Sequence, residues 1–132
     1  MKSLEELREL FTNDRFAKFN NIEITEINEK YAICTAVIQN SHLNANDIVH
    51  GGMLFTLADF AFGVYCNAVH PLTLTQTASI SYINPCFNTK YVTATARELA
   101  HEKHNCVCEV VLNDDKGRIL CIAQINGFVK AN

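Results

Sequence analysis

Hydrophobic positions recur along this chain at two different spacings. Between residues 53 and 67 they follow the 3.6-residue spacing of a helix, at Leu54, Leu57, Ala58, Ala61 and Tyr65. Phe55 and Phe62 make a second face of the same segment apolar. A helix that is apolar nearly all round is normally buried nearly all round. The pattern therefore predicts a buried helix over 53–67, ended by the His70-Pro71 pair.

The other hydrophobic positions alternate or form short runs rich in β-branched residues, which is typical of strands. Six runs are of this kind: 21–26, 31–39, 72–83, 91–99, 106–112 and 119–129. Polar turns separate neighbouring runs at 28–30, 100–105 and 113–117. A polar loop at 40–49 leads into the helix. Ser3 and Glu6 have the spacing of a capping box, which predicts a short helix over about 4–11.

These elements predict a single α+β domain over residues 1–132. A buried helix followed by an antiparallel meander is packed most simply by a curved sheet that wraps around the helix. A chain of 132 residues suits one domain. Its composition, 48% hydrophobic and 19% charged, suits a packed core.

Charge and hydropathy exclude several classes of partner. The net charge of −3 leaves no basic patch for nucleic acid. No stretch reaches the roughly 18 consecutive apolar residues of a membrane span, and the charged start of the chain lacks the apolar core of a signal peptide. We therefore expect a cytoplasmic protein that binds neither nucleic acid nor a membrane.

The six cysteines are expected to be free and buried, because a reducing compartment disfavours disulfides. Cys106 and Cys108 share one face of a strand and do not form a CxxC pair. No spacing of cysteine and histidine favours a metal site. Four histidines lie outside any motif and are expected at the surface: His42, His70, His101 and His104.

One acidic residue stands alone in the middle of the chain. Asp59 is the only Asp, Glu, Lys or Arg between residues 48 and 89. Burying an unpaired carboxylate costs several kcal/mol, so Asp59 needs either a structural partner or a chemical use. Gly51 and Gly52 allow close backbone approach where the helix begins. A carboxylate and backbone donors on one helix are parts of a hydrolytic site; a structural acid that caps a backbone group or pairs with a histidine is the alternative.

The motif His50-Gly51-Gly52 is followed by Leu57-Ala58-Asp59, and Asn44 stands six residues before His50. A strand rich in Thr and Ser then closes on Tyr82-Ile83-Asn84-Pro85. Together these residues resemble the hotdog fold and, more closely, the PaaI-like acyl-CoA thioesterases, from about residue 21 to 129. The resemblance implies a curved antiparallel sheet around a central helix, an acyl-CoA substrate, and a homodimer or dimer of dimers with sites between protomers. It implies no metal and no redox cofactor.

The resemblance also implies a role for each catalytic position. Asp59 acts as a general base on water or as a nucleophile, and the Gly51 backbone N–H polarises the thioester carbonyl. His50 shapes the turn, and Asn44 helps to place the water or the carbonyl. Thr75 falls where related enzymes carry a Ser or Thr from the partner chain. From the residues alone, Asn44 is equally a turn former and Thr75 an ordinary strand residue.

Four positions are expected to contact substrate: Gly52, Phe55, Phe62 and Asn84. Phe55 and Phe62, with Tyr65, suit an aryl or a medium-chain acyl group. Related enzymes often carry a basic residue where Asn84 stands, so the CoA phosphate contacts are not assigned; Lys90, Arg97 and Lys130 are candidates. The leading function is an acyl-CoA thioesterase. The alternatives are a non-catalytic acyl-CoA binder and a hotdog dehydratase, which would need a catalytic histidine beside its carboxylate.

Overall fold

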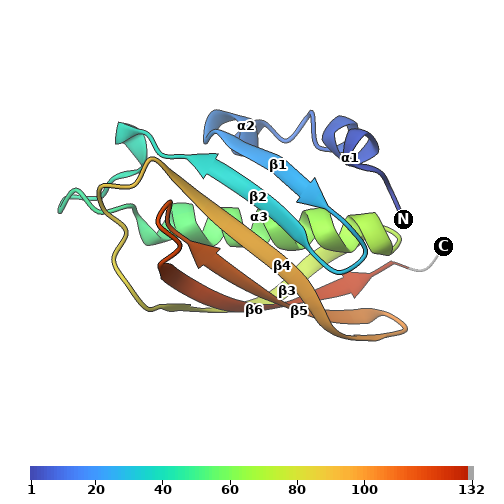
Figure 1. The fold of residues 1–132 in the computed structure, drawn as a ribbon. Coiled ribbons are helices and arrows are strands. Elements are labelled where there is room, and N and C mark those ends of the chain that lie inside the picture. Colours follow the sequence, from blue (N-terminus) through green and yellow to red (C-terminus); the bar gives the residue numbers. More distant parts are fainter. Residues whose placement is uncertain (131–132) are drawn as a thin grey trace.

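The structure is a computed structural model and describes residues 1–130. One curved antiparallel sheet wraps around a long central helix, which confirms the predicted α+β hotdog fold (Figure 1). The helical elements are α1 (Leu4–Leu10), α2 (Arg15–Phe19), the 3-10 turn η1 (Asn40–His42) and α3 (Gly51–Val69). The strands are β1 (Ile22–Ile27), β2 (Ala32–Val37), β3 (Thr73–Tyr82), β4 (Tyr91–Glu102), β5 (Asn105–Asn113) and β6 (Ile119–Val129).

Helix α3 begins two residues earlier than its hydrophobic pattern, because His50 caps it. The His50 Nδ1 atom accepts a hydrogen bond from the Gly52 N–H at 2.9 Å. One face of α3 packs into the curve of the sheet, where Leu57, Ala61 and Phe62 are 1% exposed or less. Burial nearly all round, which the sequence predicts, is not reached in the single chain. A second face is only half-buried: Phe55, Thr56, Asp59, Phe60 and Gly63.

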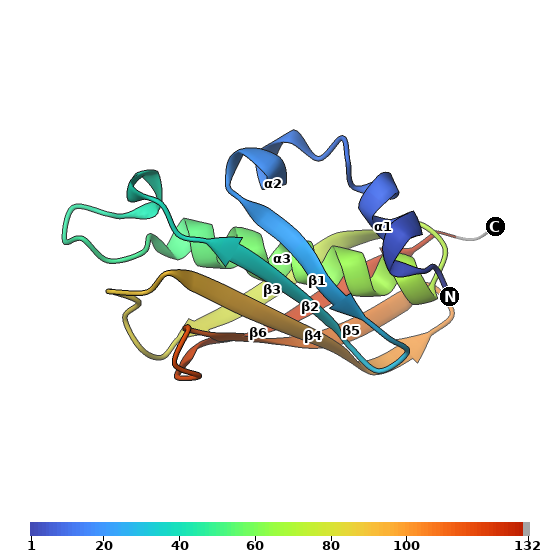
Figure 2. The same ribbon diagram turned by 45° about the horizontal axis from the view of Figure 1, so that its top comes forward.

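The strand order is β1-β2-β4-β5-β6-β3, which differs from a simple meander of the last four strands. Strands β4, β5 and β6 do form a meander, but β3 pairs with β6 at the far edge. The hairpin of β1 and β2 occupies the place beside β4, through pairs such as Cys34↔Ala94. Figure 2 shows β1 and β2 on one side of α3, with β3 behind the helix. The alternation of side chains within each strand is the same in a simple meander and in the observed strand order. The sequence pattern therefore did not distinguish the two orders.

The N-terminal segment contains two short helices, of which one was predicted. The Ser3 and Glu6 capping box is present at the start of α1, and Leu7 anchors this helix in the core. Helix α2 was not predicted; the Asp14 side chain caps it by accepting the Ala17 N–H at 2.9 Å. Phe16 and Phe19 of this helix are 63% and 73% exposed.

All six cysteines are free and buried, as predicted. The Cys66 thiol lies 3.6 Å from the Cys106 sulfur and 3.5 Å from the Cys108 sulfur, between α3 and β5. The neighbouring Cys108 thiol and burial raise the pKa of Cys66, and burial raises the pKa of Cys121 to about 11. These thiols are therefore protonated at neutral pH and pack as small apolar side chains.

Helix α3 is long and apolar enough to cross a membrane by length and composition alone. In the folded chain, 61% of its apolar window is buried inside the protein. Its apolar character is thus used to fill the curve of the sheet.

Candidate active site

The lone carboxylate of the central helix meets a threonine of the same chain. The Thr75 hydroxyl of β3 donates a hydrogen bond to Asp59 Oδ1 at 2.6 Å. Asp59 is half-buried on α3, and Thr75 is exposed. A hydrogen bond to an ionised carboxylate is stronger than one between neutral groups. Asp59 therefore has a partner, yet its second oxygen makes no hydrogen bond with any side chain or backbone group of residues 1–130.

The expectation that Thr75 comes from a partner chain to meet Asp59 is corrected by this contact. Strand β3 follows α3 after a short turn and runs back along the helix, so one chain brings both residues together. Asn67 sets this alignment: its Oδ1 accepts the Thr73 N–H at 2.9 Å, and its Nδ2 donates to the Gly63 and Thr73 carbonyls. Asn67 thus joins α3 to β3 two residues before Thr75.

A bulge in β3 sets which residues face the helix beyond Thr75. The pairing with β6 passes from Thr75↔Gly127 to Thr77↔Asn126, which leaves Gln76 without a partner. A bulge of this kind resets the alternation of side chains along the strand. Gly127, the pairing partner of Thr75, carries no side chain, which leaves room for the Phe62 ring of α3.

The start of α3 presents an unused backbone donor. The Gly52 N–H is taken by His50 Nδ1, and the Met53 and Leu54 N–H groups donate to the His50 carbonyl. The Gly51 N–H makes no hydrogen bond within residues 1–130. The helix dipole adds partial positive charge at this end. The geometry is therefore compatible with a carbonyl oxygen binding at Gly51, and it supports His50 as the residue that shapes the turn.

Tyr82 is a neighbour of this helix start that the sequence did not single out. Its hydroxyl donates to the Gly51 carbonyl at 2.9 Å, across 31 residues of chain. A Cβ atom at position 51 would stand 3.2 Å from the Tyr82 ring. Gly51 thus allows the close approach of Tyr82, which holds the first turn of α3 against the end of β3.

Asn44 uses its side-chain oxygen within its own loop. Oδ1 accepts the Asn46 N–H at 2.9 Å and the Ile48 N–H at 3.2 Å, as a turn former does. Only the amide nitrogen is left to face a substrate. The role implied for Asn44 in placing water or a carbonyl stays a prediction.

Two aromatic residues expected at the substrate belong to the core. Phe62 is 0% exposed, and its ring tip stands 2.6 Å from where a Cβ of Gly127 would be. Tyr65 is 4% exposed and donates its hydroxyl to the Glu29 carbonyl at 2.8 Å. Both lie on the face of α3 that packs into the sheet, because successive residues rotate about 100° around a helix. Phe55 lies on the half-buried face, and its contact with substrate stays a prediction.

The polar and basic candidates for binding CoA have structural partners. Asn84 donates its amide to the Ile119 carbonyl at 2.7 Å and so holds the end of β3 near β6. Arg97 pairs with Glu109 at 3.0 Å. The Lys90 N–H donates to the Asp115 carboxylate and its carbonyl accepts the Ile38 N–H, each at 2.9 Å, while the Lys130 N–H donates to the Leu72 carbonyl. The phosphate contacts therefore stay unassigned.

One histidine expected at the surface is a buried structural residue. His42 is 3% exposed, and its Nε2 lies 3.2 Å from the Asn20 Oδ1 atom. Burial lowers the pKa of His42, so the ring is held neutral at physiological pH. It fixes η1 against the N-terminal segment, and its carbonyl accepts the His50 N–H at 2.8 Å, which leads into the capped start of α3.

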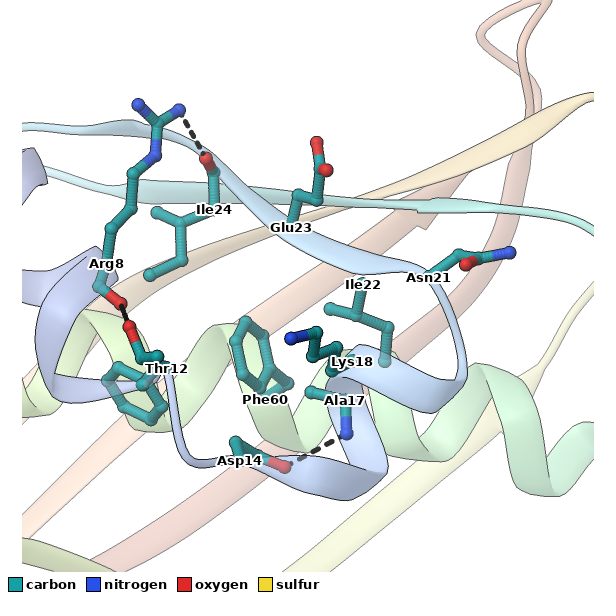
Figure 3. Close-up of a pocket in the computed structure, with 11 residues that line it drawn as sticks. Arg8, Thr12, Asp14, Ala17, Lys18, Asn21, Ile22, Glu23, Ile24 and Phe60 are labelled. Atoms are coloured by element: carbon teal, nitrogen blue, oxygen red, sulfur yellow. Dashed lines mark hydrogen bonds between the residues drawn. The ribbon is translucent and has the colours of Figure 1, made fainter.

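Two pockets flank α3, and neither includes Asp59 or Thr75. One, of about 710 Å³, lies between α1, α2, β1 and the helix; Figure 3 shows Phe60 inside it, with Arg8 held to the Ile24 carbonyl at its rim. A smaller one, of about 200 Å³, lies beside His50, Gly52 and Thr56. In the single chain, Thr75 is exposed and Asp59 is half-buried, so the pair is reached from the surface.

Comparison with known proteins identifies the family. The model of the thioesterase superfamily matches residues 46–121, more than half of the chain. The acyl-coenzyme A thioesterase PaaI of Escherichia coli is 27% identical over 121 residues, which are 92% of this chain and 86% of that protein. A protein of Archaeoglobus fulgidus with a provisional esterase name is 33% identical over 90 residues, which are 68% of this chain but only 58% of its relative.

Solved structures agree with this assignment. The Escherichia coli PaaI protein, from the phenylacetic acid degradation operon, superposes with a TM-score of 0.90 at 25% identity, covering 98% of each chain. A hypothetical thioesterase of Streptococcus pneumoniae, solved with coenzyme A, has a TM-score of 0.85 at 27% identity and covers 95% of this chain and 98% of its own.

Two further structures of the streptococcal protein carry alanine in place of a threonine at its position 68 or an aspartate at its position 52. Those positions are 16 residues apart, and so are Asp59 and Thr75 here. With the family model matched over residues 46–121 and the hotdog architecture shared along nearly the whole chain, this protein belongs to the thioesterase superfamily.

Proposed function

We propose that this protein is an acyl-CoA thioesterase that hydrolyses a thioester to a free acid and CoA. The observation that carries the proposal is the Asp59 carboxylate, held by Thr75 on an open face of α3 that begins with the unused Gly51 N–H. The likeness to a thioesterase solved with coenzyme A, and to one named for acyl-coenzyme A, supports the substrate class.

The chemistry follows from two groups, the Asp59 carboxylate and the Gly51 N–H. As a general base, Asp59 takes a proton from water, and the resulting hydroxide attacks the thioester carbonyl carbon. Negative charge then develops on the carbonyl oxygen, where a Gly51 N–H and the helix dipole stabilise it. Because Gly51 and Asp59 of one chain are about 12 Å apart along α3, this donor comes from the second protomer of a homodimer. Collapse of the tetrahedral intermediate breaks the C–S bond, and the CoA thiolate leaves and takes up a proton. As a nucleophile, Asp59 would attack the carbonyl carbon itself, break the C–S bond with loss of the CoA thiolate, and form an anhydride that water then hydrolyses.

Thr75 has a positioning role in either route. Its hydrogen bond occupies Asp59 Oδ1 and orients the carboxylate, so that the other oxygen faces the water or the thioester. This hydrogen bond also lowers the rotational freedom of Asp59 before the reaction begins, which favours a reactive geometry.

Release of CoA by the purified protein tests the proposal. The free thiol is measured with a chromogenic thiol reagent for a panel of aryl, short-chain and medium-chain acyl-CoA substrates. We expect turnover of at least one class above the rate without protein. Acyl-CoA binding by calorimetry without turnover of any member of the panel would instead identify a non-catalytic binder.

Replacement of Thr75 by alanine should lower kcat about 10- to 100-fold, because a hydrogen bond to a charged group contributes about 1.5–3 kcal/mol. Thr75→Ser keeps the hydroxyl and should recover most of the activity. Thr77→Ala is the matched control, since Thr77 is also exposed but lies beyond the bulge. Steady-state kinetics check this; equal kcat for Thr75→Ala and Thr77→Ala would contradict the positioning role.

We also infer a homodimer or a dimer of dimers. Strand β3 is an edge strand with most of its residues exposed, including Leu74 at 60% and Tyr82 at 53%. A long edge with apolar side chains is normally covered by another chain or another element. The half-buried face of α3 that carries Asp59 lies next to this strand, so a second protomer would also enclose the site.

Light scattering on an active sample measures the assembly. We expect a mass of about 30 kDa, twice the 14.8 kDa of one chain, or about twice that for a dimer of dimers. An active species of about one chain mass at micromolar concentration would contradict the inference.

A further inference from the structure

Three potential metal ligands meet at the end of α3 that is remote from Gly51: His70, Glu98 and His101. The His70 Nε2 atom lies 2.5 Å from Glu98 Oε2. The His70 and His101 rings stack with their centroids 4.1 Å apart. One ligand atom from each of the three residues lies within 4.8 Å of the others. The two histidines had been expected as unrelated surface residues, so this cluster is visible only in the fold.

A bulge in β4 brings two of these ligands onto one face of the sheet. In a regular strand, positions 98 and 101 would point to opposite faces. The pairing with β5 instead shifts from Glu98↔Cys108 to Ala100↔Val107 and His101↔Cys106, which leaves Leu99 as the extra residue. Cys106 and Cys108 are both buried against α3. Paired residues of antiparallel strands point to the same side of the sheet. Glu98, paired with Cys108, and His101, paired with Cys106, therefore both point toward the end of the helix.

The third ligand is held in place by the helix end. His70 is the residue after α3, and its N–H donates to the Cys66 carbonyl at 2.8 Å. The side chains of His70 and Glu98 are only 11% and 22% exposed, whereas His101 is exposed near the end of the hairpin. In Figures 1 and 2 the hairpin of β4 and β5 lies at the same end of the molecule as the last turn of α3.

We propose that His70, Glu98 and His101 bind a divalent transition-metal ion of the Zn²⁺ type, which fastens the hairpin of β4 and β5 to the end of α3. Two imidazoles and one carboxylate are a ligand set that suits Zn²⁺, with water in the fourth position. The ion replaces the hydrogen now shared by His70 and Glu98. Within residues 1–130, His70 is the only residue that forms an ion pair with Glu98, so no lysine or arginine competes with the metal.

The fit requires small movements of the ligands. Around a tetrahedral zinc ion, with bonds of about 2.0–2.2 Å, the ligand atoms lie roughly 3.4 Å apart. The 2.5 Å between His70 Nε2 and Glu98 Oε2 must therefore widen by about 0.9 Å, and the largest separation, up to 4.8 Å, must shorten by up to about 1.4 Å. His101 supplies the shortening, because it is exposed and lies one residue from the end of β4.

This site is separate from the proposed hydrolytic chemistry. His70 lies 11 residues beyond Asp59, which is about 16 Å along a helix. The ion would therefore stabilise the fold and take no part in hydrolysis, and the binding test is independent of the proposed function.

Metal uptake by the full chain tests the proposal. Protein stripped with a chelator, dialysed and kept reduced is titrated with Zn²⁺ by calorimetry and with Co²⁺ by visible absorption. We expect one ion per chain with a micromolar or lower Kd, a higher Tm, and Co²⁺ d–d bands without an intense thiolate charge-transfer band. No stoichiometric uptake, or a thiolate band that assigns the ion to the cysteines, would overturn it.

Variants locate the ion. His101→Ala removes an exposed ligand without touching the core and should weaken Zn²⁺ binding at least about tenfold, since even residues that merely support metal ligands contribute about 10- to 100-fold. Glu98→Gln should do the same. His104→Ala, a histidine of the same hairpin outside the cluster, is the control and should bind as wild type does. Equal Zn²⁺ affinity in His101→Ala and wild type would overturn the assignment, and the circular dichroism spectrum checks that His101→Ala is folded.

Discussion

Asp59→Asn should lower kcat by about 10²-fold or more, with a smaller change in KM and an unchanged fold. Asparagine has nearly the same shape and still accepts the hydrogen bond from Thr75, so the helix and strand stay in place. It cannot take a proton from water or attack a carbonyl as a carboxylate does. Because this loss acts on the transition state, it appears mainly in kcat.

Steady-state kinetics on the best acyl-CoA substrate, together with the Tm, measure this effect. Asp47→Asn is the matched control: the same substitution in the exposed loop before α3, at a positive φ of 58° that asparagine tolerates. We expect near wild-type kcat for that control. Near-normal turnover in a folded Asp59→Asn protein would remove Asp59 from the chemistry.

Phe62→Ala should lower the free energy of unfolding by about 3–5 kcal/mol, as expected for a fully buried aromatic side chain. That loss is a large fraction of the 5–15 kcal/mol typical of a domain. Phe55→Ala is the control, because Phe55 is half-buried on the same helix and should cost less stability. Urea denaturation at one protein concentration measures both variants, since association also contributes to stability.

Phe62→Leu keeps the comparison possible if the alanine variant does not fold. It should be folded, less stable than wild type, and nearly unchanged in KM. Phe55→Leu should instead change KM for long or aryl acyl groups more than it changes stability. A raised KM for Phe62→Leu at unchanged stability would place Phe62 at the substrate and contradict its position in the core.

Gly127 offers a second check on the same packing. A Cβ there would stand 2.6 Å from the Phe62 ring tip and 2.8 Å from a Thr73 methyl group. Gly127→Ala should therefore be destabilising in wild type and less so in the background of Phe62→Ala, where the closest contact has been removed. Additive effects of the two substitutions on stability would show that the Phe62 ring does not contact β6 at Gly127.

Some features followed from short stretches of sequence because their causes are local. The 3.6-residue spacing around Leu57 identified α3, and the Ser3 and Glu6 spacing identified α1. The isolated charge drew attention to Asp59, and the structure shows Thr75 as its hydrogen-bond partner. Helix α2 was missed since five residues carry too little periodicity to stand out.

The candidate site was only partly visible in the sequence. The motif around His50 and Gly51 indicated a helix start with backbone donors, and the structure leaves the Gly51 N–H without a partner within residues 1–130. The contact of Thr75 with Asp59 in one chain depends on how β3 returns along α3, through the hydrogen bonds of Asn67. The burial of Phe62 depends on which face of an almost uniformly apolar helix the sheet covers.

The fold class, the central helix, most strands and the lone carboxylate are visible in the sequence, because spacing and capping act within a few residues. The place of β3 beside β6, the pair formed by Asp59 and Thr75, and the gathering of His70, Glu98 and His101 depend on how the chain packs. Alternation shows that a strand has two faces but not which strand lies beside it. A single extra residue, such as Gln76 or Leu99, reverses the alternation beyond it, and that reversal exists only once the strands have paired.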